Sequence, residues 1–160
     1  MKEVKIETTL EVYDSMAELP KDVQQLMQLA IKVRENAYSP YSKFNVGAAI
    51  LLDNGEIVSG SNQENASYPS GLCAERTAIY YAGATYPKSK MLKMALTASS
   101  QNQVTDKPIP PCGACRQAIA EYEIKQNQPI EIYFMGAEGK VVKSESLANL
   151  LPLLFESSVL

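Results

Sequence analysis

The chain contains three cysteines and no histidine in its 160 residues. Cys73 precedes Glu75 by two residues, and Cys112 and Cys115 form a Cys-x-x-Cys pair directly after Pro111. A structural zinc site normally has four protein ligands, whereas a catalytic site keeps one position open for water. Three thiols without an imidazole therefore predict an open metal site, which must draw two distant segments of the chain together.

The absence of histidine also limits the proton chemistry that the chain can perform. Histidine is the usual general base and the usual partner of a serine or cysteine nucleophile. Another group must therefore carry protons here. Glu75, close to the first cysteine in sequence, is the candidate.

Composition and charge exclude several classes of protein. A chain of 160 residues with 46% hydrophobic residues suits one compact domain. The net charge of -3 disfavours an electrostatic grip on nucleic acid, so a small ligand is expected. No apolar run reaches the roughly 20 residues that span a bilayer, and the first residues alternate in charge. We therefore expect a cytoplasmic protein without membrane contact, in which an odd number of cysteines makes a disulfide framework unlikely and shifts the Cys-x-x-Cys pair towards metal or redox chemistry.

Hydrophobic patterning in the first third of the chain predicts three features. Residues 4–13 alternate between apolar and polar, as in a half-exposed strand at an edge or interface. Helical spacing follows Pro20 and ends near Pro40. Residues 46–52 and 56–60 flank an Asn-Gly pair that readily takes the positive φ values of a tight hairpin turn.

The rest of the chain alternates helical and strand patterns around a polar, proline-rich loop at 99–111. We expect helices at 73–83, 113–125 and 146–151, and strands at 91–98, 129–135 and 141–142. Such interleaving predicts an α/β fold, a three-layer α/β/α sandwich with a mixed central sheet. Residues 1–20 form an N-terminal extension, expected to be a strand, and residues 21–160 form a single domain.

The expected positions of the cysteines have an electrostatic consequence. If both segments open helices, free N–H groups and the positive end of each dipole point at the sulfurs, which favours thiolates. Three thiolates leave the zinc cluster at a charge of about -1, which weakens the metal as a Lewis acid. Arg76 and Arg116 are candidate donors that would offset this charge.

Each element also has a simpler interpretation. A lone Cys73 is more often a small buried hydrophobe than a ligand. A lone Cys-x-x-Cys pair could be a redox pair or half of a zinc ribbon. Together, however, Cys-x-Glu followed by Pro-Cys-x-x-Cys is the arrangement of the zinc nucleobase deaminases, in an all-cysteine version.

At these residues the chain resembles the small, all-cysteine zinc cytidine deaminases, which form homotetramers. The resemblance covers about residues 22–155 and implies the α/β/α fold of that family, one Zn²⁺ per subunit and a nucleoside substrate. It rests on five stretches: 41–49 (YSKFNVGAA), 60–66 (GSNQENA), 73–78 (CAERTA), 111–117 (PCGACRQ) and 150–155 (LLPLLF).

The resemblance assigns the chemistry to four residues. Cys73, Cys112 and Cys115 would hold zinc, which activates a water for attack on C4 of cytosine. Glu75 would take a proton from that water and pass protons to N3 and the departing amino group. The hydrolase would thus turn cytidine or deoxycytidine into uridine or deoxyuridine and ammonia, as in pyrimidine salvage.

The resemblance also implies a set of substrate-binding residues. Asn62 and Glu64 would bind the ribose, and Glu64 would accept a hydrogen bond from the 3'-hydroxyl. Phe44 would lie near the pyrimidine, and the main chain around Ala74 would contact the base edge. The simpler interpretations are a polar exit from a strand for Asn62 and Glu64, and core packing for Phe44.

Two further aromatic residues connect the expected site with neighbouring subunits. Tyr68 lies in the family's substrate-binding stretch, although a plain interface tyrosine would look the same. Phe155 would reach into an adjacent subunit's site and stack on the base, so that tetramers share their active sites. Pro110 departs from the Ser or Thr that the family often has there, and this removes a hydroxyl but leaves a carbonyl that can accept a hydrogen bond.

The sequence separates three rival functions to different degrees. A deaminase of the same fold acting on blasticidin S would show the same metal ligands. Guanine and tRNA adenosine deaminases usually have histidine as the first ligand, which Cys73 does not match. A non-catalytic zinc scaffold would need a fourth ligand, for which Glu75 is the candidate.

Overall fold

The computed structural model describes residues 1–156, in which six strands form one mixed sheet of order β1-β6-β5-β4-β2-β3. Strands β4 and β5 are parallel, and the other neighbouring pairs are antiparallel. The strands are β1 (Glu11–Tyr13), β2 (Phe44–Leu52), β3 (Ile57–Ser61), β4 (Met91–Ser100), β5 (Glu131–Met135) and β6 (Val141–Ser144). The helices are α1 (Lys21–Arg34), α2 (Ala74–Thr85) and α3 (Gly113–Gln126).

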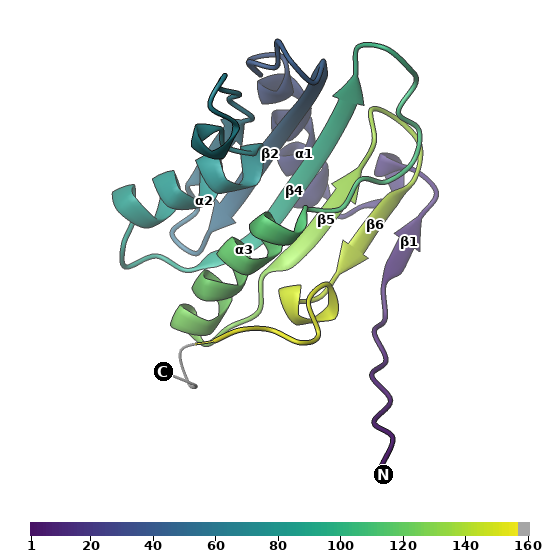
Figure 1. Ribbon diagram of the computed structural model, residues 1–160, viewed down its shortest axis with the longest axis vertical. Coiled ribbons are helices and arrows are strands. Elements are labelled where there is room, and N and C mark those ends of the chain that lie inside the picture. The colour runs from purple at the N-terminus through teal and green to yellow at the C-terminus, as the bar shows by residue number, and fades with distance from the viewer. Residues whose placement is uncertain (157–160) are drawn as a thin grey trace.

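The helices cover both faces of the sheet, so the predicted three-layer α/β/α sandwich is confirmed (Figure 1). Helices α2 and α3 pack on one face, where Ile79 and Ile119 join a core with Met94 of β4. Helix α1 packs on the other face through Leu26 and Met27. No helix among residues 1–156 is long and apolar enough to cross a bilayer.

The hairpin between β2 and β3 forms where the Asn-Gly pair predicted it, but with a different turn. Of the Asn54-Gly55 pair, only Gly55 has a positive φ, of 85°. Its N–H donates to the Leu52 carbonyl, and the Leu52 N–H donates to the Glu56 carbonyl, so three residues make the connection. The Asn54 side chain instead accepts from the Glu56 N–H at 3.0 Å. Such three-residue loops place the glycine after an ordinary turn.

The strand predicted for residues 4–13 is much shorter in the structure. Only Glu11–Tyr13 pairs, with β6 as its partner. The reason is that β6 ends at Ser144, whose hydroxyl donates to the Ser146 carbonyl as the chain turns away. Residues 1–10 therefore lack a neighbouring strand, although the predicted edge position is confirmed.

The helix predicted at 146–151 is also wrong. A single 3₁₀ turn, Leu147–Asn149, takes its place, and the Ser146 side chain caps it by accepting from the Ala148 N–H. Pro152 explains the short element, because proline disfavours helical conformation in the residue before it and offers no N–H of its own.

Two glycines bring the layers into backbone contact. A Cβ on Gly47 of β2 would lie 2.0 Å from the Ala30 carbonyl oxygen of α1. A Cβ on Gly60 of β3 would lie 2.9 Å from the Ala74 carbonyl oxygen and 2.8 Å from the Ala78 nitrogen of α2. Only glycine permits such close approach. The start of α2, which carries the functional residues, thus rests directly on β3.

We therefore expect Gly60→Ala to lower the free energy of unfolding by about 2 kcal/mol, because the added methyl group overpacks a backbone contact. Turnover should fall as well, since the first turn of α2 must shift. Urea unfolding followed by circular dichroism measures the first effect. Gly113→Ala is the control, since a Cβ there meets nothing within 4 Å. Equal unfolding free energies for the two variants would contradict the packing argument.

Candidate metal centre and substrate cavity

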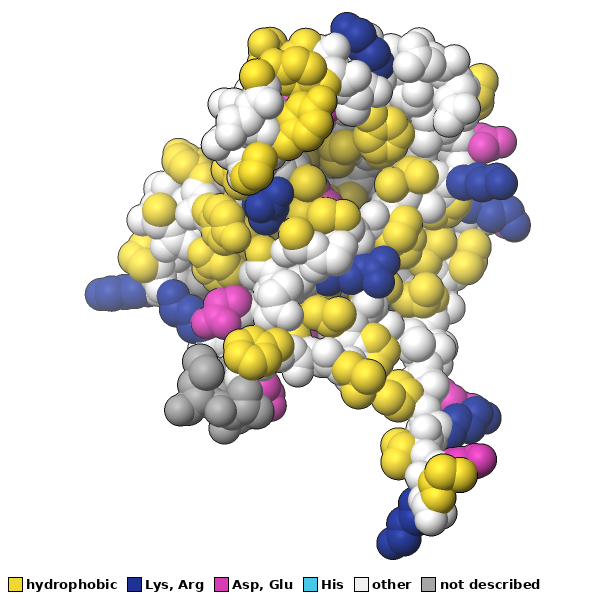
Figure 2. Space-filling model, viewed as in Figure 1, with side chains coloured by type: hydrophobic (Ala, Val, Ile, Leu, Met, Phe, Trp, Pro, Cys, Tyr) yellow, Lys and Arg dark blue, Asp and Glu magenta, His cyan; other side chains and the backbone are white. Residues whose placement is uncertain are grey.

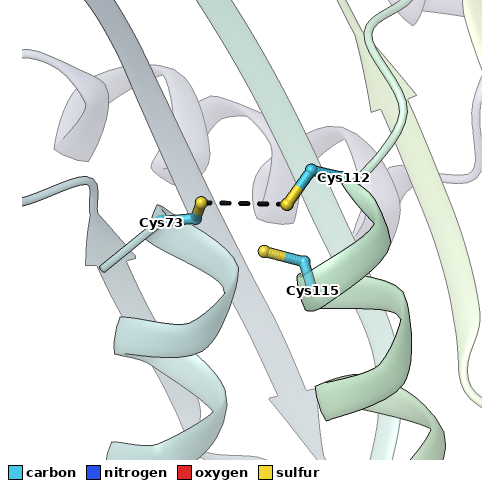
Figure 3. A group of neighbouring side chains, drawn as sticks. All are labelled: Cys73, Cys112 and Cys115. Atoms are coloured by element: carbon cyan, nitrogen blue, oxygen red, sulfur yellow. Dashed lines mark hydrogen bonds between the residues drawn. The ribbon is translucent and has the colours of Figure 1, made fainter. Parts of the chain in front are cut away.

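The three cysteine sulfurs gather between the starts of α2 and α3 (Figure 3). Cys73 is the N-cap of α2, Cys112 is the N-cap of α3, and Cys115 lies in the first turn of α3. The three Sγ atoms lie within 4.8 Å of one another, and those of Cys73 and Cys112 are 4.0 Å apart. The prediction that both segments open helices is confirmed.

This donor set fits a zinc ion. Zn–S bonds of about 2.3 Å in a tetrahedron place two sulfurs about 3.8 Å apart, close to the observed spacing. Within residues 1–156 the cluster consists of the three cysteines alone, and the chain has no histidine. The arrangement therefore matches a three-ligand site with a position left for water.

The thiols perturb one another strongly. The pKa of Cys73 is lowered to about 5, first by its hydrogen bond with Cys115 and then by the bond from Arg76. The pKa of Cys115 is raised, first by its hydrogen bond with Cys73 and then by burial of the thiol. The cluster thus already holds negative charge at neutral pH, which a divalent cation would stabilise.

The two arginines near the cluster have different contacts. Arg76 Nη2 donates to Cys73 Sγ at 3.8 Å, and this bond raises the pKa of Arg76. Arg116 instead donates from Nε to the Pro111 carbonyl at 2.8 Å and from Nη1 to the Leu150 carbonyl at 2.7 Å. Arg76 therefore has the position expected of a charge-balancing residue, whereas Arg116 braces the loop before Cys112.

Glu75 is buried beside the thiols with part of its carboxylate unpaired. The residue is 5% exposed, and its Oε2 has no hydrogen-bond partner among the described residues. Burial raises the pKa of this carboxyl. A buried oxygen without a partner costs free energy, so it is best explained by a ligand that completes the site.

A cavity of about 390 Å³ opens above Cys73, Cys112 and Glu75. Its volume lies within the range of small-molecule sites. The space-filling view shows a hollow on this side of the molecule, with hydrophobic side chains around it (Figure 2). The walls are largely apolar, and their apolar residues include Phe44, Val46, Leu96, Ile109 and Pro110.

Asn62 and Glu64 line this cavity and are fixed by backbone hydrogen bonds. Asn62 accepts from the Val46 N–H at 2.7 Å and donates to the Phe44 carbonyl at 2.9 Å. Glu64 Oε2 accepts from the N–H groups of Tyr41, at 2.9 Å, and Ser42, at 3.2 Å. Hydrogen bonding, first from the Ser42 side chain, lowers the pKa of Glu64.

A second hollow, of about 470 Å³, adjoins the first and shares Asn62, Glu64 and Cys73 with it. Tyr68 lies here, 75% exposed, with its ring packed edge-on against Tyr41 at 5.8 Å between centroids. The sequence-based reasoning gave Tyr41 no role. Tyr41 begins the 41–49 stretch, and this position is the sequence signal that could have pointed to it. Its contribution to the site is the backbone N–H that donates to Glu64.

The last two predicted site residues, Ala74 and Phe155, differ in burial. Ala74 is fully buried as the first residue of α2, directly after Cys73. Phe155 is 62% exposed, and its carbonyl accepts a hydrogen bond from the Gln117 side chain at 2.8 Å. Phe155 is not among the described residues that line either hollow.

The model of the cytidine and deoxycytidylate deaminase zinc-binding region matches residues 20–128. The chain belongs to the cytidine and deoxycytidylate deaminase family. The matched range contains all three cysteines and Glu75, so the family match and the cluster geometry agree on a zinc centre.

Known members of this family support the assignment. A cytidine deaminase of Sporosarcina psychrophila is 41% identical over 134 residues, which cover 84% of this chain and 91% of that protein. A cytidine deaminase of Halalkalibacterium halodurans is 47% identical over 100 residues, which cover 62% of this chain and 71% of that protein. The crystal structure of a cytidine deaminase from Burkholderia pseudomallei has a similar fold, with a TM-score of 0.71 and 35% sequence identity. The match covers 86% of this chain and 100% of the Burkholderia protein.

The position of Arg76 generates a prediction for this deaminase-family zinc centre. Arg76→Ala should retain zinc, but a chelator should remove the metal at least about tenfold faster, as when outer-shell partners of other metal sites are lost. Arg76→Lys keeps the positive charge, and its rate of zinc loss should lie between those of the parent and Arg76→Ala. Metal content measured by mass spectrometry during chelation tests this. Identical release curves for the parent and Arg76→Ala would show that the guanidinium is only a surface group.

Proposed function

We propose that the protein hydrolyses cytidine and 2'-deoxycytidine to uridine and 2'-deoxyuridine, with release of ammonia, as a step of pyrimidine salvage. The observation that carries the proposal is the buried Glu75 carboxylate, whose Oε2 is unpaired, in a cavity that it lines together with two of the three clustered thiols, Cys73 and Cys112. The relatives in Sporosarcina psychrophila and Halalkalibacterium halodurans, named cytidine deaminases, support it. A cytoplasmic location suits an enzyme that must keep three thiols reduced.

In the proposed reaction, zinc held by Cys73, Cys112 and Cys115 would supply an activated water for attack on C4. Glu75 accepts the first proton of this water and passes it to N3. The same carboxylate then takes the remaining proton from the hydroxyl formed at C4 and donates it to the departing amino group, so that water and cytidine become uridine and ammonia. One carboxylate acts first as base and then as acid, which explains how the chain works without histidine.

The cavity walls suggest how the pyrimidine is held. Phe44, Leu96 and Ile109 form an apolar slot that would sandwich the flat base and exclude water. The main chain at Ala74 would contact the base edge. Pro110 lines the same cavity, and its carbonyl is our candidate acceptor for the amino group that leaves.

Glu64 and Asn62 are our candidates for the ribose contacts. Both line the cavity that contains Glu75. The bonds from Tyr41 and Ser42 hold the Glu64 carboxylate in a fixed position, ready to accept from the 3'-hydroxyl. Asn62 already uses both ends of its amide on β2, so its second Nδ2 hydrogen is what remains for a sugar.

We further propose that the enzyme is a homotetramer with shared active sites. Phe155, exposed and separate from the cavity of its own subunit, is suited to stack on a base bound by a neighbour. Tyr68, also exposed, would lie where such a neighbour approaches. Dilution below the assembly threshold should then reduce activity.

The direct test follows the loss of cytidine absorbance in the presence and absence of a zinc chelator. We expect turnover of cytidine and deoxycytidine that the chelator abolishes and added zinc restores. Blasticidin S is the competing substrate in the same assay. A zinc-loaded protein that releases no ammonia from cytidine would identify a scaffold, and faster turnover of blasticidin S would reassign the substrate.

Glu75→Gln should keep its zinc and lose at least about 10³-fold in kcat, because the amide cannot shuttle a proton. Zinc content by mass spectrometry and ammonia release are the two measurements. Glu75→Asp is the matched variant, since it keeps a carboxyl but withdraws it, and it should retain more activity. A near-normal rate for Glu75→Gln would exclude this residue as the proton carrier.

For the sugar, we expect kcat/KM for 3'-deoxycytidine to be at least about 50-fold below that for cytidine, because the Glu64 carboxylate would be left unpaired. Deoxycytidine, which keeps the 3'-hydroxyl, is the control and should be processed. In Glu64→Gln the values of kcat/KM for cytidine and 3'-deoxycytidine should converge. Equal processing of 3'-deoxycytidine by the parent would exclude the proposed contact.

A further inference from the structure

Residues 2–13, here called the arm, extend from the edge of the sheet into solvent (Figure 1). Glu11–Tyr13 of the arm pair with β6 on one side, and the sheet order leaves the other edge of β1 unpaired within the described chain. The family match begins only at residue 20. The arm is therefore an addition to the catalytic fold.

The arm has the sequence of a strand that lacks a neighbour. Val4, Ile6, Leu10 and Val12 recur on one side and are 85%, 50%, 42% and 59% exposed. Charged side chains alternate with them, and both kinds project from the arm in the space-filling view (Figure 2). An exposed alternating strand next to an open sheet edge is a template for pairing with another chain.

We propose that the arm pairs antiparallel with the arm of a second copy of this chain, across a two-fold axis at Thr8. In that register Lys5 lies opposite Glu11 and Lys2 lies opposite Asp14. Each complementary charge pair occurs twice because of the symmetry. Val4 meets Val12 and Ile6 meets Leu10 on the same face as the Lys2–Asp14 pair, whereas Lys5 and Glu11 lie on the opposite face.

Neighbouring registers lack this complementarity. An axis at Glu7 would set Glu7 against itself and Glu3 against Glu11, and like charges directly opposite each other destabilise a sheet. An axis at Ile6 keeps one charge pair, Lys5 with Glu7, but sets Lys2 against Leu10. Any shift that changes parity moves the apolar side chains of one arm onto the polar face of the other.

The charges within the same subunit do not prevent this pairing. Lys5 contacts Glu7, Asp14 contacts Lys140 at 3.1 Å, and Glu11 contacts Lys143 at 3.4 Å. The four side chains of the Lys5–Glu7 and Lys140–Asp14 pairs are all more than half exposed. Such exposed ion pairs are weak and can share a carboxylate with a further lysine. The open edge of β1 would thereby be covered by its own symmetry mate.

Disulfide trapping tests the register directly in the zinc-loaded protein. Opposite residues of antiparallel strands have Cα atoms about 4.5–5.5 Å apart, within disulfide range. Thr8→Cys should therefore form a linked dimer on mild oxidation, seen on a non-reducing gel. Val4→Cys is the matched control, because two Val4 positions would lie about 27 Å apart. It should link only when mixed with Val12→Cys.

The outcomes separate the possible occupants. An arm that folds on its own subunit, or that binds a different protein, leaves Thr8→Cys unlinked and overturns the proposal. Equal linking of Thr8→Cys and Val4→Cys would show unspecific contact and overturn it too. The parent protein, with its three native cysteines, gives the background. Cytidine turnover, measured in parallel, reports on the catalytic proposal separately.

A charge exchange provides an independent check in the Thr8→Cys background. Lys5→Glu alone sets Glu against Glu11, and Glu11→Lys alone sets Lys against Lys5, so linking in each should fall at least about fivefold. A mixture of the two variants places opposite charges together again and should restore a mixed dimer. Unchanged linking in the single variants, or no recovery in the mixture, would overturn the proposal.

Discussion

Negative charge concentrated between two helix starts is the constraint on which the site depends. Three sulfurs lie within 4.8 Å of one another, and a buried carboxylate lies beside them. Such a group is tolerable only because the N-termini of α2 and α3 face it with free N–H groups, and because Arg76 contacts Cys73. The sheet meets this requirement by placing both helices on one face, with their first turns at the same end.

A hydrogen-bonded frame on the opposite side of the sheet stiffens this end of the molecule. Arg34, the last residue of α1, donates to Thr97 Oγ1 at 2.6 Å, and Thr97 donates to the Gly136 carbonyl at 2.7 Å. Thr97 also lines the cavity that contains Glu75. The frame joins α1 to β4 and to the turn after β5, so one wall of the cavity is held by elements from three parts of the chain. Asn62 does the same for the wall between β2 and β3.

The sequence was most informative where a local pattern decides the structure. The spacing of Cys73, Glu75, Cys112 and Cys115 predicted the cluster and its helix starts, and the resemblance at 41–49 and 60–66 indicated the cavity residues. The predictions failed where the length of an element depends on another part of the chain. The strand at 4–13 is short because β6 ends early, and the helix at 146–151 is short because of Pro152. Arg76 follows Glu75 and Arg116 follows Cys115 directly in sequence, and only tertiary contacts separate the roles of the two arginines.

The backbone contacts at Gly47 and Gly60 set the distance between the sheet and the helices. The position of the site therefore does not depend on which side chains fill the core. Where backbone touches backbone, the spacing between layers does not depend on which side chains fill the space beside it. Substitutions among Leu, Ile and Met elsewhere in the core can then repack without moving the first turn of α2. A chain built this way can tolerate such changes in its interior and still hold a carboxylate and three sulfurs in one arrangement.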